Sequence, residues 1–364
     1  MKTSVLIPAY NEKIVIGPTI QSLIDSGFNP GDIFIVDDYS TDGTYEAAKQ
    51  YTSNVVTTPN NNGKAAAQTY GLNKFQLLHK YDYVIMLDCD SSVSYDFKDI
   101  LFAEAYKNPH VDLFVGQVVN ARNDGLISAL RAVEYTFSHD FIKKGQDNFN
   151  VIYVSPGCAS MYSTRILKRL YFDSSTLAED MDLTLQVHSL GAKIKYIHEA
   201  KVVTQDPKTI GDYIKQITRW YRGFWQIVNK YGILKFGFKP RVNLYMLYLI
   251  LDTLIANRVL IIFLSMFFLP LKFVVLGLSI DFIVFFLLSL YAAIKTKRYD
   301  ISLKTPLLYP LLFLNAYAFV RSFIEVIVLR KKTFGWNKVM RYKGDTHEKD
   351  YSGAISSASD TGSR

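Results

Sequence analysis

The chain has 364 residues, a formal net charge of +8 and only two cysteines, Cys89 and Cys158. So few cysteines argue against a disulfide framework and a cysteine-based zinc site. The basic charge suits a nucleic acid, an anionic membrane surface or a phosphorylated substrate, but no basic stripe with a recognition motif is present, so we expect no nucleic-acid partner. Apolar residues make up 49% of the chain and concentrate after Asn243. We therefore expect a globular domain followed by a membrane region.

The N-terminus reads MKTSVLIPAYNE. Its apolar run is short and is followed at once by Pro8 and Glu12, which is unlike a signal peptide. We expect the N-terminal domain to remain in the cytoplasm, and the chain to be an integral membrane protein, in the cell membrane, held there by its C-terminal part.

Residues 3 to about 205 alternate short apolar runs with amphipathic stretches. Such alternation predicts an α/β domain with a mostly parallel sheet, and ligands bind such sheets at the carboxyl ends of the strands. The expected strands are Ser4–Ile7, Ile33–Val36, Asn54–Thr57, Tyr83–Leu87, Leu113–Val118 and Lys193–Ile197. Helices are expected at Val15–Ser26 and Thr44–Tyr51.

Polar, acidic or Gly/Lys-rich turns follow four of these strands in succession, at residues 8–12, 37–44, 60–65 and 88–91. Any one of them can be an ordinary polar loop. Four in this order predict a ligand site along one edge of the sheet.

Asp88 and Asp90 flank one residue at the end of an apolar strand, so their side chains are expected to share a face. Two such carboxylates can hold Mg²⁺ or Mn²⁺ together with substrate phosphates, although an isolated pair also fits a solvated turn. Asp38 after the second strand suits a ribose hydroxyl or a base edge, or again a plain turn. Gly63-Lys64 would place a cation near a pyrophosphate, without forming a P-loop.

Two motifs follow further along. Leu177–Asp182 opens an amphipathic stretch that runs to about Leu190, and acids at a helix start also complement its dipole. Gln216, Arg219 and Trp220 are spaced to share one face of a helix over Asp212–Val228. An amide, a guanidinium and an indole suit a phosphate and a sugar ring, but they also suit a helix at a membrane interface.

The ordered series PAYNE, VDDYSTDGT, NNNGKAAA, LDCDS, SPGCASMYS, LAEDMD and QITRW resembles family 2 glycosyltransferases. It is most similar to the membrane-integrated synthases of cellulose, chitin, hyaluronan and poly-N-acetylglucosamine. The resemblance covers about Thr3 to Trp220. It implies a GT-A (Rossmann-like) fold, an inverting mechanism, a UDP-sugar donor and Mn²⁺ or Mg²⁺ as cofactor.

The resemblance also implies a substrate site. Its expected members are Tyr10 and Glu12 at the base and ribose, Asp38 at the nucleoside, Lys64 near the nucleotide, and Gln216, Arg219 and Trp220 over the diphosphate and the acceptor sugar.

By the same resemblance, Asp88 and Asp90 are the metal-binding pair, with Asp90 the direct ligand. Asp180 matches the catalytic base and follows Glu179, the other acid of that motif. One departure is visible, because Ala178 replaces the usual threonine. That change leaves room for a different acceptor geometry.

Three apolar segments, Asn243–Pro270, Leu271–Ile294 and Pro306–Leu329, each approach the roughly 20 residues that a membrane span needs. Three crossings would place the C-terminus opposite the catalytic domain. The basic clusters at residues 295–298 and 330–332 favour the same side as that domain. The sequence leaves open whether the last segment is re-entrant or interfacial, or whether an earlier boundary is misplaced.

The expected division is a cytosolic GT-A catalytic domain at 1–205, an interfacial amphipathic helix region at 206–242, a membrane region at 243–332 and a polar tail at 333–364. Its final stretch, Asp345–Arg364, is rich in Ser and Gly and is expected to be disordered.

The leading functional interpretation is a processive enzyme that transfers sugar from a UDP-sugar to a growing polysaccharide and translocates the product. The alternative is transfer of one sugar to a membrane lipid, as in ceramide glucosyltransferases. The acceptor is thus a polysaccharide or is lipid-linked, and membrane lipid is an expected partner. A silent nucleotide-sugar sensor or channel component is a further possibility, but the presence of all the acids argues against it.

Overall fold

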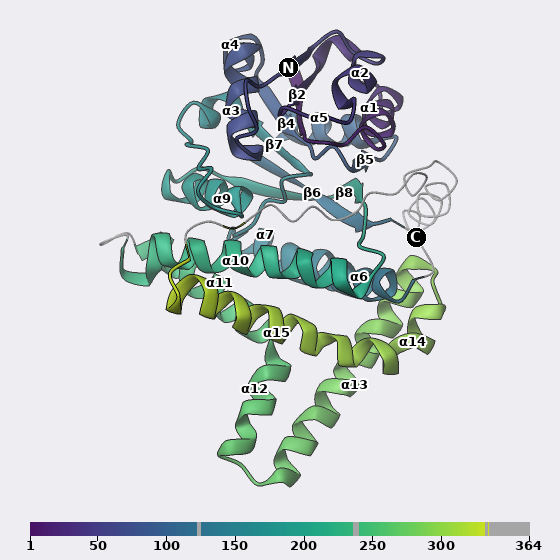
Figure 1. The fold of residues 1–364 in the computed structure, drawn as a ribbon, viewed down its shortest axis with the longest axis vertical. Helices are drawn as coiled ribbons and strands as arrows, with labels where there is room; N and C mark the ends of the chain where they lie inside the picture. The colour runs from purple at the N-terminus through teal and green to yellow at the C-terminus, as the bar shows by residue number, and fades with distance from the viewer. Residues whose placement is uncertain (122–124, 236–239, 332–333, 335–364) are drawn as a thin grey trace.

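The computed structural model describes residues 1–121, 125–235, 240–331 and 334. Figure 1 shows an α/β domain, a layer of long helices across its base, and a helical hairpin that projects from this layer away from the sheet. In the described residues the sheet has eight strands in the order β3-β2-β1-β4-β7-β6-β8-β5. This is the expected α/β class.

The strands are β1 (Thr3–Ala9), β2 (Ile33–Asp37), β3 (Val55–Thr57), β4 (Tyr83–Met86), β5 (Ser91–Val93), β6 (Leu113–Asn120), β7 (Ser160–Ser163) and β8 (Ile194–Thr204). β1 to β4 pair in parallel with one another, and β6 pairs in parallel with β8. β7 runs antiparallel between β4 and β6, and β5 runs antiparallel to β8. All six expected strands are confirmed with shifted ends, whereas β5 and β7 are additional.

Helices cover both faces of the sheet. The helices of this domain are α1 (Ile16–Asp25), α2 (Thr44–Lys49), α3 (Lys64–Lys74), α4 (Leu77–Lys80), α5 (Phe97–Lys107), α6 (Leu126–Phe137), α7 (Lys144–Asn148), α8 (Thr164–Leu167) and α9 (Glu179–Ser189), with a 3₁₀ turn η1 (Pro30–Asp32) and a π-helical turn η2 (Ser138–Lys143). α1 and α5 pack on one face of the sheet, where Ile7 and Ile35 point. α3, α4 and α8 pack on the other face, where Leu6 and Val36 point. Successive side chains of β1 and β2 point to opposite faces of the sheet. Since apolar residues point to both faces, these two strands contribute to both halves of the core.

The base layer and the hairpin are entirely helical in the described residues. Their elements are α10 (Ile210–Lys235), α11 (Pro240–Ala256), α12 (Arg258–Leu264), η3 (Ser265–Phe267), α13 (Leu271–Thr296), α14 (Asp300–Leu308), η4 (Tyr309–Leu311), α15 (Leu312–Phe323) and η5 (Ile324–Val328). α10 and α15 run across the base, and α12 and α13 form the hairpin (Figure 1).

Among the described residues, two stretches are long and apolar enough to cross a membrane, Leu271–Thr296 and Asp300–Val328. A third would be Tyr245–Ala256 together with Arg258–Phe267, but these two helices are bent by 70°. The expected segment Asn243–Pro270 therefore contains two helices with a bend between them, which is either a broken span or a re-entrant loop. It breaks at Asn257, whose amide donates to the Thr253 carbonyl and to the Tyr221 hydroxyl. Apart from residue 334, the expected polar tail lies outside the described residues.

Close packing of α3 on the sheet gives a stability test at Gly71. A Cβ there would lie 2.5 Å from Cγ2 of Val36 and 2.7 Å from Cδ1 of Leu6. Because both neighbours are fully buried, Gly71→Ala should lower the free energy of unfolding by about 1–3 kcal/mol. Gly145→Ala on α7 is the matched control, since its Cβ would meet open space. Thermal unfolding of the purified chain checks this, and equal melting temperatures for the two variants would contradict the packing.

Candidate functional site

A cavity of about 460 Å³ opens beside the carboxyl ends of β1, β2 and β4 and is closed by α6, α9 and α10. All eleven site residues expected from the sequence line it: Tyr10, Glu12, Asp38, Lys64, Asp88, Asp90, Glu179, Asp180, Gln216, Arg219 and Trp220. Strand-end turns supply the first six, and two helix segments supply the other five. The sheet topology therefore brings together residues that span more than half of the chain.

The turns after β1 and β2 are locked to each other. Asn11 has a left-handed backbone with φ 54°, as has Tyr39 with φ 63°. The Asn11 amide donates to Oγ of Ser40 at 2.8 Å, and its side-chain oxygen accepts from the Thr41 amide at 2.9 Å. Strained residues of this kind persist when their surroundings hold them, and here they fix the edge of the cavity next to Tyr10 and Glu12.

Asp38 organises the loop before α3. Its carboxylate accepts hydrogen bonds from the Gly63 amide at 2.9 Å, from the Thr58 hydroxyl at 2.9 Å and from the Asn62 amide at 3.3 Å. Burial raises the pKa of Asp38, and these three bonds partly offset that effect. The carboxylate therefore holds the loop that presents Lys64, in addition to any contact with a nucleoside.

Lys64 lies between two acidic groups. Its Nζ is 2.6 Å from Oδ1 of Asp88 and 2.8 Å from Oε1 of Glu179. Burial alone would lower the pKa of Lys64, but Asp88, Glu179 and Asp180 outweigh it and hold that pKa well above its usual value. Gly157 leaves space for the ammonium group, because a Cβ there would lie 2.5 Å from Nζ. One fixed cation therefore joins the β4 turn to the start of α9.

Asp180 stands in the first turn of α9, beside Glu179. Burial, and then the charge of Glu179, raise the pKa of Asp180 to about 6, although Lys64 acts in the opposite direction. Oδ1 of Asp180 accepts from the Met181 amide at 2.8 Å. A carboxylate with a pKa just below neutrality is ionised at pH 7 and basic enough to take a proton from a hydroxyl.

Asp88 and Asp90 follow β4 in a turn rather than in the strand itself, and both face the cavity. In the described part of the chain, no cluster of three or more histidine, cysteine or acidic side chains forms a ready ligand set for a metal ion. Mg²⁺ and Mn²⁺ commonly bind one or two carboxylates together with substrate phosphates. The pair therefore fits a divalent ion that arrives with a diphosphate.

Arg131 on α6 supports the α10 motif and was missed by the sequence analysis. It donates to Oε1 of Gln216, and its guanidinium carbon lies 4.7 Å from the Trp220 ring centroid. It also pairs with Oε2 of Glu134 at 2.7 Å, and only 2% of the residue is exposed. The available signal was an arginine in the largely apolar stretch LISALRAVEYTF, three residues before Glu134.

The departure at position 178 has a packing explanation. Ala178 precedes α9 and faces Gly223 on α10, where an added Cβ would lie 2.6 Å from the Ala178 Cβ. Two small residues thus let α10 approach the start of α9 closely. The motif helix and Asp180 are held together by this contact.

A further wall of the cavity also escaped the sequence analysis. It is formed by α6, η2 and the adjoining segments, through Tyr135, Ser138, His139, Ile142, Lys143, Gln146, Tyr153 and Val154. Lys143 donates to the Val154 carbonyl at 2.5 Å, and burial lowers the pKa of its ammonium to about 8. Burial also lowers the pKa of His139. The spacing 135, 138, 139, 142 and 146 is helical, which was the signal available in the sequence.

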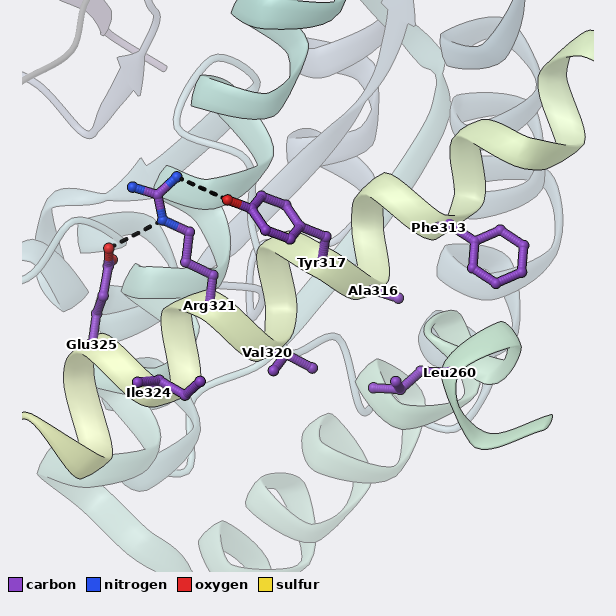
Figure 2. A pocket seen from close by; sticks show the side chains of 8 residues that line it. All are labelled: Leu260, Phe313, Ala316, Tyr317, Val320, Arg321, Ile324 and Glu325. Atoms are coloured by element: carbon purple, nitrogen blue, oxygen red, sulfur yellow. Dashed lines mark hydrogen bonds and ion pairs between the residues drawn. The ribbon is translucent and has the colours of Figure 1, made fainter. Parts of the chain in front are cut away.

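A second cavity, of about 490 Å³, lies between α12 and α15 (Figure 2). Its lining residues are Leu260, Phe313, Ala316, Tyr317, Val320, Arg321, Ile324 and Glu325. None of them lines the first cavity. This groove is mostly apolar, and Arg321, Glu325 and Tyr317 supply the polar groups.

The sequence of this chain is similar to known glycosyltransferases. Residues 4–171 match the family model described as glycosyl transferase family 2. A poly-beta-1,6-N-acetyl-D-glucosamine synthase of Staphylococcus epidermidis is 27% identical over 225 residues, which are 60% of this chain and 54% of that protein. The same enzyme of Staphylococcus aureus strain COL is 25% identical over 223 residues, 60% of this chain and 53% of that protein. The chain thus spans about half the length of these relatives.

Among solved structures, S. aureus TarS 1-349 in complex with UDP-GlcNAc has a TM-score of 0.50 at 16% identity, covering 94% of this chain and 98% of that one. The mannosyltransferase PcManGT from Pyrobaculum calidifontis, in complex with GDP-Man and Mn²⁺, has a TM-score of 0.50 at 16% identity, covering 88% of this chain and 87% of that one. These two likenesses concern the fold, and they agree with the expected GT-A architecture.

The contacts of Arg131 lead to a stability prediction. Arg131→Met leaves Glu134 without its ion pair and removes the support of Gln216, so we expect the free energy of unfolding to fall by about 3 kcal/mol. Lys215→Met is the control, because Lys215 is half-exposed and pairs with Asp212 on its own helix. That change should cost less than about 1 kcal/mol. Chemical unfolding in detergent measures both, and similar losses would refute a buried supporting role for Arg131.

Proposed function

We propose that the protein transfers a sugar from a UDP-sugar to a growing polysaccharide with inversion at the anomeric carbon, since residues 4–171 match the model of glycosyl transferase family 2. The observation that carries the proposal is the cavity in which Lys64 joins Asp88 to Glu179, next to Asp180. The relatives named as poly-beta-1,6-N-acetyl-D-glucosamine synthases support N-acetylglucosamine as the sugar and a polymer as the product.

The strand-end turns form the donor half of the site. Tyr10, Glu12 and Asp38 receive the nucleoside, and the protonated Lys64 lies close enough to the Asp88 turn to attract the diphosphate. Asp90 and Asp88 would hold Mn²⁺ or Mg²⁺, which, when bound, neutralises charge on the leaving diphosphate.

Asp180 acts as the base of a single displacement. Its ionised carboxylate accepts the proton of an acceptor hydroxyl while that oxygen attacks the anomeric carbon. The bond to the UDP oxygen breaks on the opposite side, so the configuration inverts. Arg219 and Lys64 stabilise the negative charge that develops on UDP. Trp220 stacks on the acceptor ring and orients it for attack.

The wall made by α6, η2 and α7 suits the acceptor. Ser138, His139, Lys143 and Gln146 offer hydrogen-bonding groups for sugar hydroxyls, and Tyr135 and Tyr153 offer aromatic faces. A saccharide end therefore fits this part of the cavity. The comparisons give no support to the alternative, a single transfer to a membrane lipid.

We infer that residues 1–205 form the catalytic domain, that 206–242 contain the helix with the Gln216, Arg219 and Trp220 motif, and that 243–332 attach the chain to the membrane. The catalytic domain then lies in the cytoplasm, where UDP-sugars are available. β8 ends at Thr204 and α10 begins at Ile210, which agrees with the first boundary.

Product analysis tests the proposal. Purified chain in nanodiscs would receive radiolabelled UDP-N-acetylglucosamine, UDP-glucose or UDP-glucuronate with Mn²⁺ or Mg²⁺. We expect a high-molecular-weight product from UDP-N-acetylglucosamine that requires the metal ion. Asp180→Asn should lower its formation by a factor of about 10²–10⁴, because the base is lost. Asp99→Asn, at an exposed carboxylate on α5, should leave the rate unchanged.

The alternatives predict other results in the same assay. Label found only in a lipid extract would identify a lipid glycosyltransferase. Bound nucleotide with neither transfer nor UDP release from any donor would indicate a sensor.

The pKa of Asp180 gives a pH prediction. Since the base must be ionised, kcat/KM should fall about tenfold per pH unit below about pH 6. Lys64 lowers the pKa of Asp180, so Lys64→Met should move this acid limb to higher pH as well as reduce the overall rate. The pH profile of UDP release measures both effects. An acid limb that stays in place in Lys64→Met would rule out the electrostatic coupling.

A further inference from the structure

The last apolar stretch lies flat along α10 instead of leaving the base layer (Figure 1). Nδ2 of Asn315 donates to the Tyr213 hydroxyl at 2.7 Å, and Oγ of Ser322 donates to the Thr218 carbonyl at 3.2 Å. Nε of Arg222 lies 2.6 Å from Oε2 of Glu325. These contacts span α15 and η5, so Asp300–Val328 cannot cross a bilayer unless α10 enters it too.

α10 is tied to the catalytic domain. Nζ of Lys230 lies 2.7 Å from Oδ2 of Asp173 and 2.8 Å from Oδ1 of Asp182, and the motif residues of the helix line the catalytic cavity. A helix with these ionic partners stays outside the hydrocarbon core. α15 therefore remains with it on the catalytic side.

Unlike α15, the hairpin of α12 and α13 leaves the base layer and exposes its apolar side chains. At its base Arg258 forms an ion pair with Asp281, and the Tyr309 hydroxyl donates to Asp281 at 3.0 Å. Between these two residues the only charged residue is Lys272. The exposed apolar side chains of this section are Ile261, Phe263, Leu264, Met266, Phe267, Phe268, Leu269, Leu271, Phe273, Val275, Leu276 and Ile280. No protein surface in the described residues covers them.

The length of the hairpin shows whether it crosses the bilayer or turns back inside it. From Arg258 to Phe267 a helix of ten residues rises about 15 Å, which is half of the roughly 30 Å hydrocarbon core. The chain then turns through Phe268–Pro270 and comes back along α13. Beyond Asp281, one face of α13 packs on the catalytic domain, where Tyr291 donates to Asp140 at 3.0 Å, and its other face keeps exposed apolar side chains such as Leu287 and Ile294.

We infer that this protein is held by one leaflet of a phospholipid bilayer, with the α12–α13 hairpin inserted to about half the core depth and α15 resting at the surface. The catalytic domain, the end of α13 and the end of α15 all lie on one side. The partner is the leaflet itself: acyl chains around the hairpin and anionic headgroups around the base layer.

Charge placement supports this arrangement. Lys295 and Lys297 lie at the end of α13, and Arg330 and Lys331 follow η5. With α15 flat, both pairs face the same headgroup layer, as basic residues on the cytoplasmic side do. A third crossing would have separated them.

The groove of Figure 2 combines apolar side chains with a few charged and polar ones, which suits the boundary between acyl chains and headgroups. Leu260 at the root of the hairpin faces Val320 and Ile324 of the surface helix. Arg321 pairs with Glu325 at 3.1 Å on the same stretch, which places charge beside an apolar trough. Lys272, near the tip, is the one charged residue of the inserted section, and its insertion into lipid is unfavourable. The insertion of the twelve exposed apolar side chains is favourable and outweighs that cost.

In this arrangement the helices of the described residues enclose no path across the bilayer. Polymer export, expected from the family resemblance, would need helices in addition to these. The inference does not rest on the proposed enzymatic activity, so either can fail alone.

Cysteine labelling tests the arrangement in full-length chain. The two native cysteines are buried, so the unchanged chain is the blank. Single variants Tyr106→Cys in the catalytic domain, Lys272→Cys at the tip, and Lys297→Cys and Lys331→Cys at the two basic ends would be exposed to a membrane-impermeant maleimide. Sealed vesicles of each orientation are used. Tyr106 is 87% exposed and marks the catalytic side.

We expect positions 106, 297 and 331 to label from the same side, and position 272 to label from neither side until detergent is added. Labelling of position 331 from the side opposite to 106 would mean that Asp300–Val328 crosses, and would overturn the inference. Labelling of position 272 from that opposite side would show a hairpin that spans the whole bilayer, and would overturn it equally.

A second measurement separates insertion from surface binding. Phe268→Asp puts a charge at the tip and should release most of the chain from anionic vesicles in a carbonate wash, whereas Tyr106→Asp should release none beyond the unchanged chain. Full retention of Phe268→Asp, with its unfolding temperature unchanged, would show that the hairpin does not enter the leaflet.

Discussion

The site depends on one cation, Lys64, which lies among its carboxylates. Asp88, Glu179 and Asp180 gather around one cavity, and such a group of carboxylates would repel itself without a positive charge among them. Lys64 supplies that charge through ion pairs with Asp88 and Glu179, and Gly157 leaves the space it occupies. Because Lys64 begins α3 directly after the loop held by Asp38, the nucleoside turn, the β4 turn and the start of α9 are positioned together. Loss of the cation would release the β4 turn and raise the pKa of Asp180 at once.

α10 connects this cavity to the membrane-facing layer through two opposite faces. At 100° per residue, Gln216, Trp220 and Gly223 fall on one side of the helix, and Thr218, Arg222 and Trp225 on the other. The first side meets the cavity and Ala178, whereas the second side contacts α15 through Phe319 and Ser322 and η5 through Glu325. The part of α10 before its kink at Gly232 therefore carries the motif residues on one side and packs on α15 with the other. Arg131 fixes its rotation from the side of the catalytic domain.

Much of the fold could be predicted because β1, β2, β3 and β4 are apolar runs bounded by turns, and the strand-end rule then placed Asp38, Lys64 and Asp88 together. β5 and β7 were missed because SSV and SMYS are short and polar, and they pair only because β8 and β6 offer edges. Arg131 and Lys143 were missed because their roles come from tertiary contacts, and the local signals, an arginine in a largely apolar helix and a helical spacing, do not identify those contacts. Asn257 is one of the polar residues that interrupt the segment Asn243–Pro270, but hydropathy does not report the 70° bend that the structure has there.

Hydropathy reports whether a segment prefers lipid, but the direction of a helix is set by what it packs against. Asp300–Val328 and the α12–α13 hairpin are both apolar, and yet one is bound to α10 by polar contacts while the other leaves the base layer with its side chains bare. In the arrangement inferred above, the end of η5 lies on the catalytic side because Asn315, Ser322 and Glu325 bind α15 and η5 to α10, and a hydropathy window counts these residues only as small interruptions. If that arrangement and the proposed activity both hold, a growing saccharide would emerge at the surface of the leaflet that holds the chain.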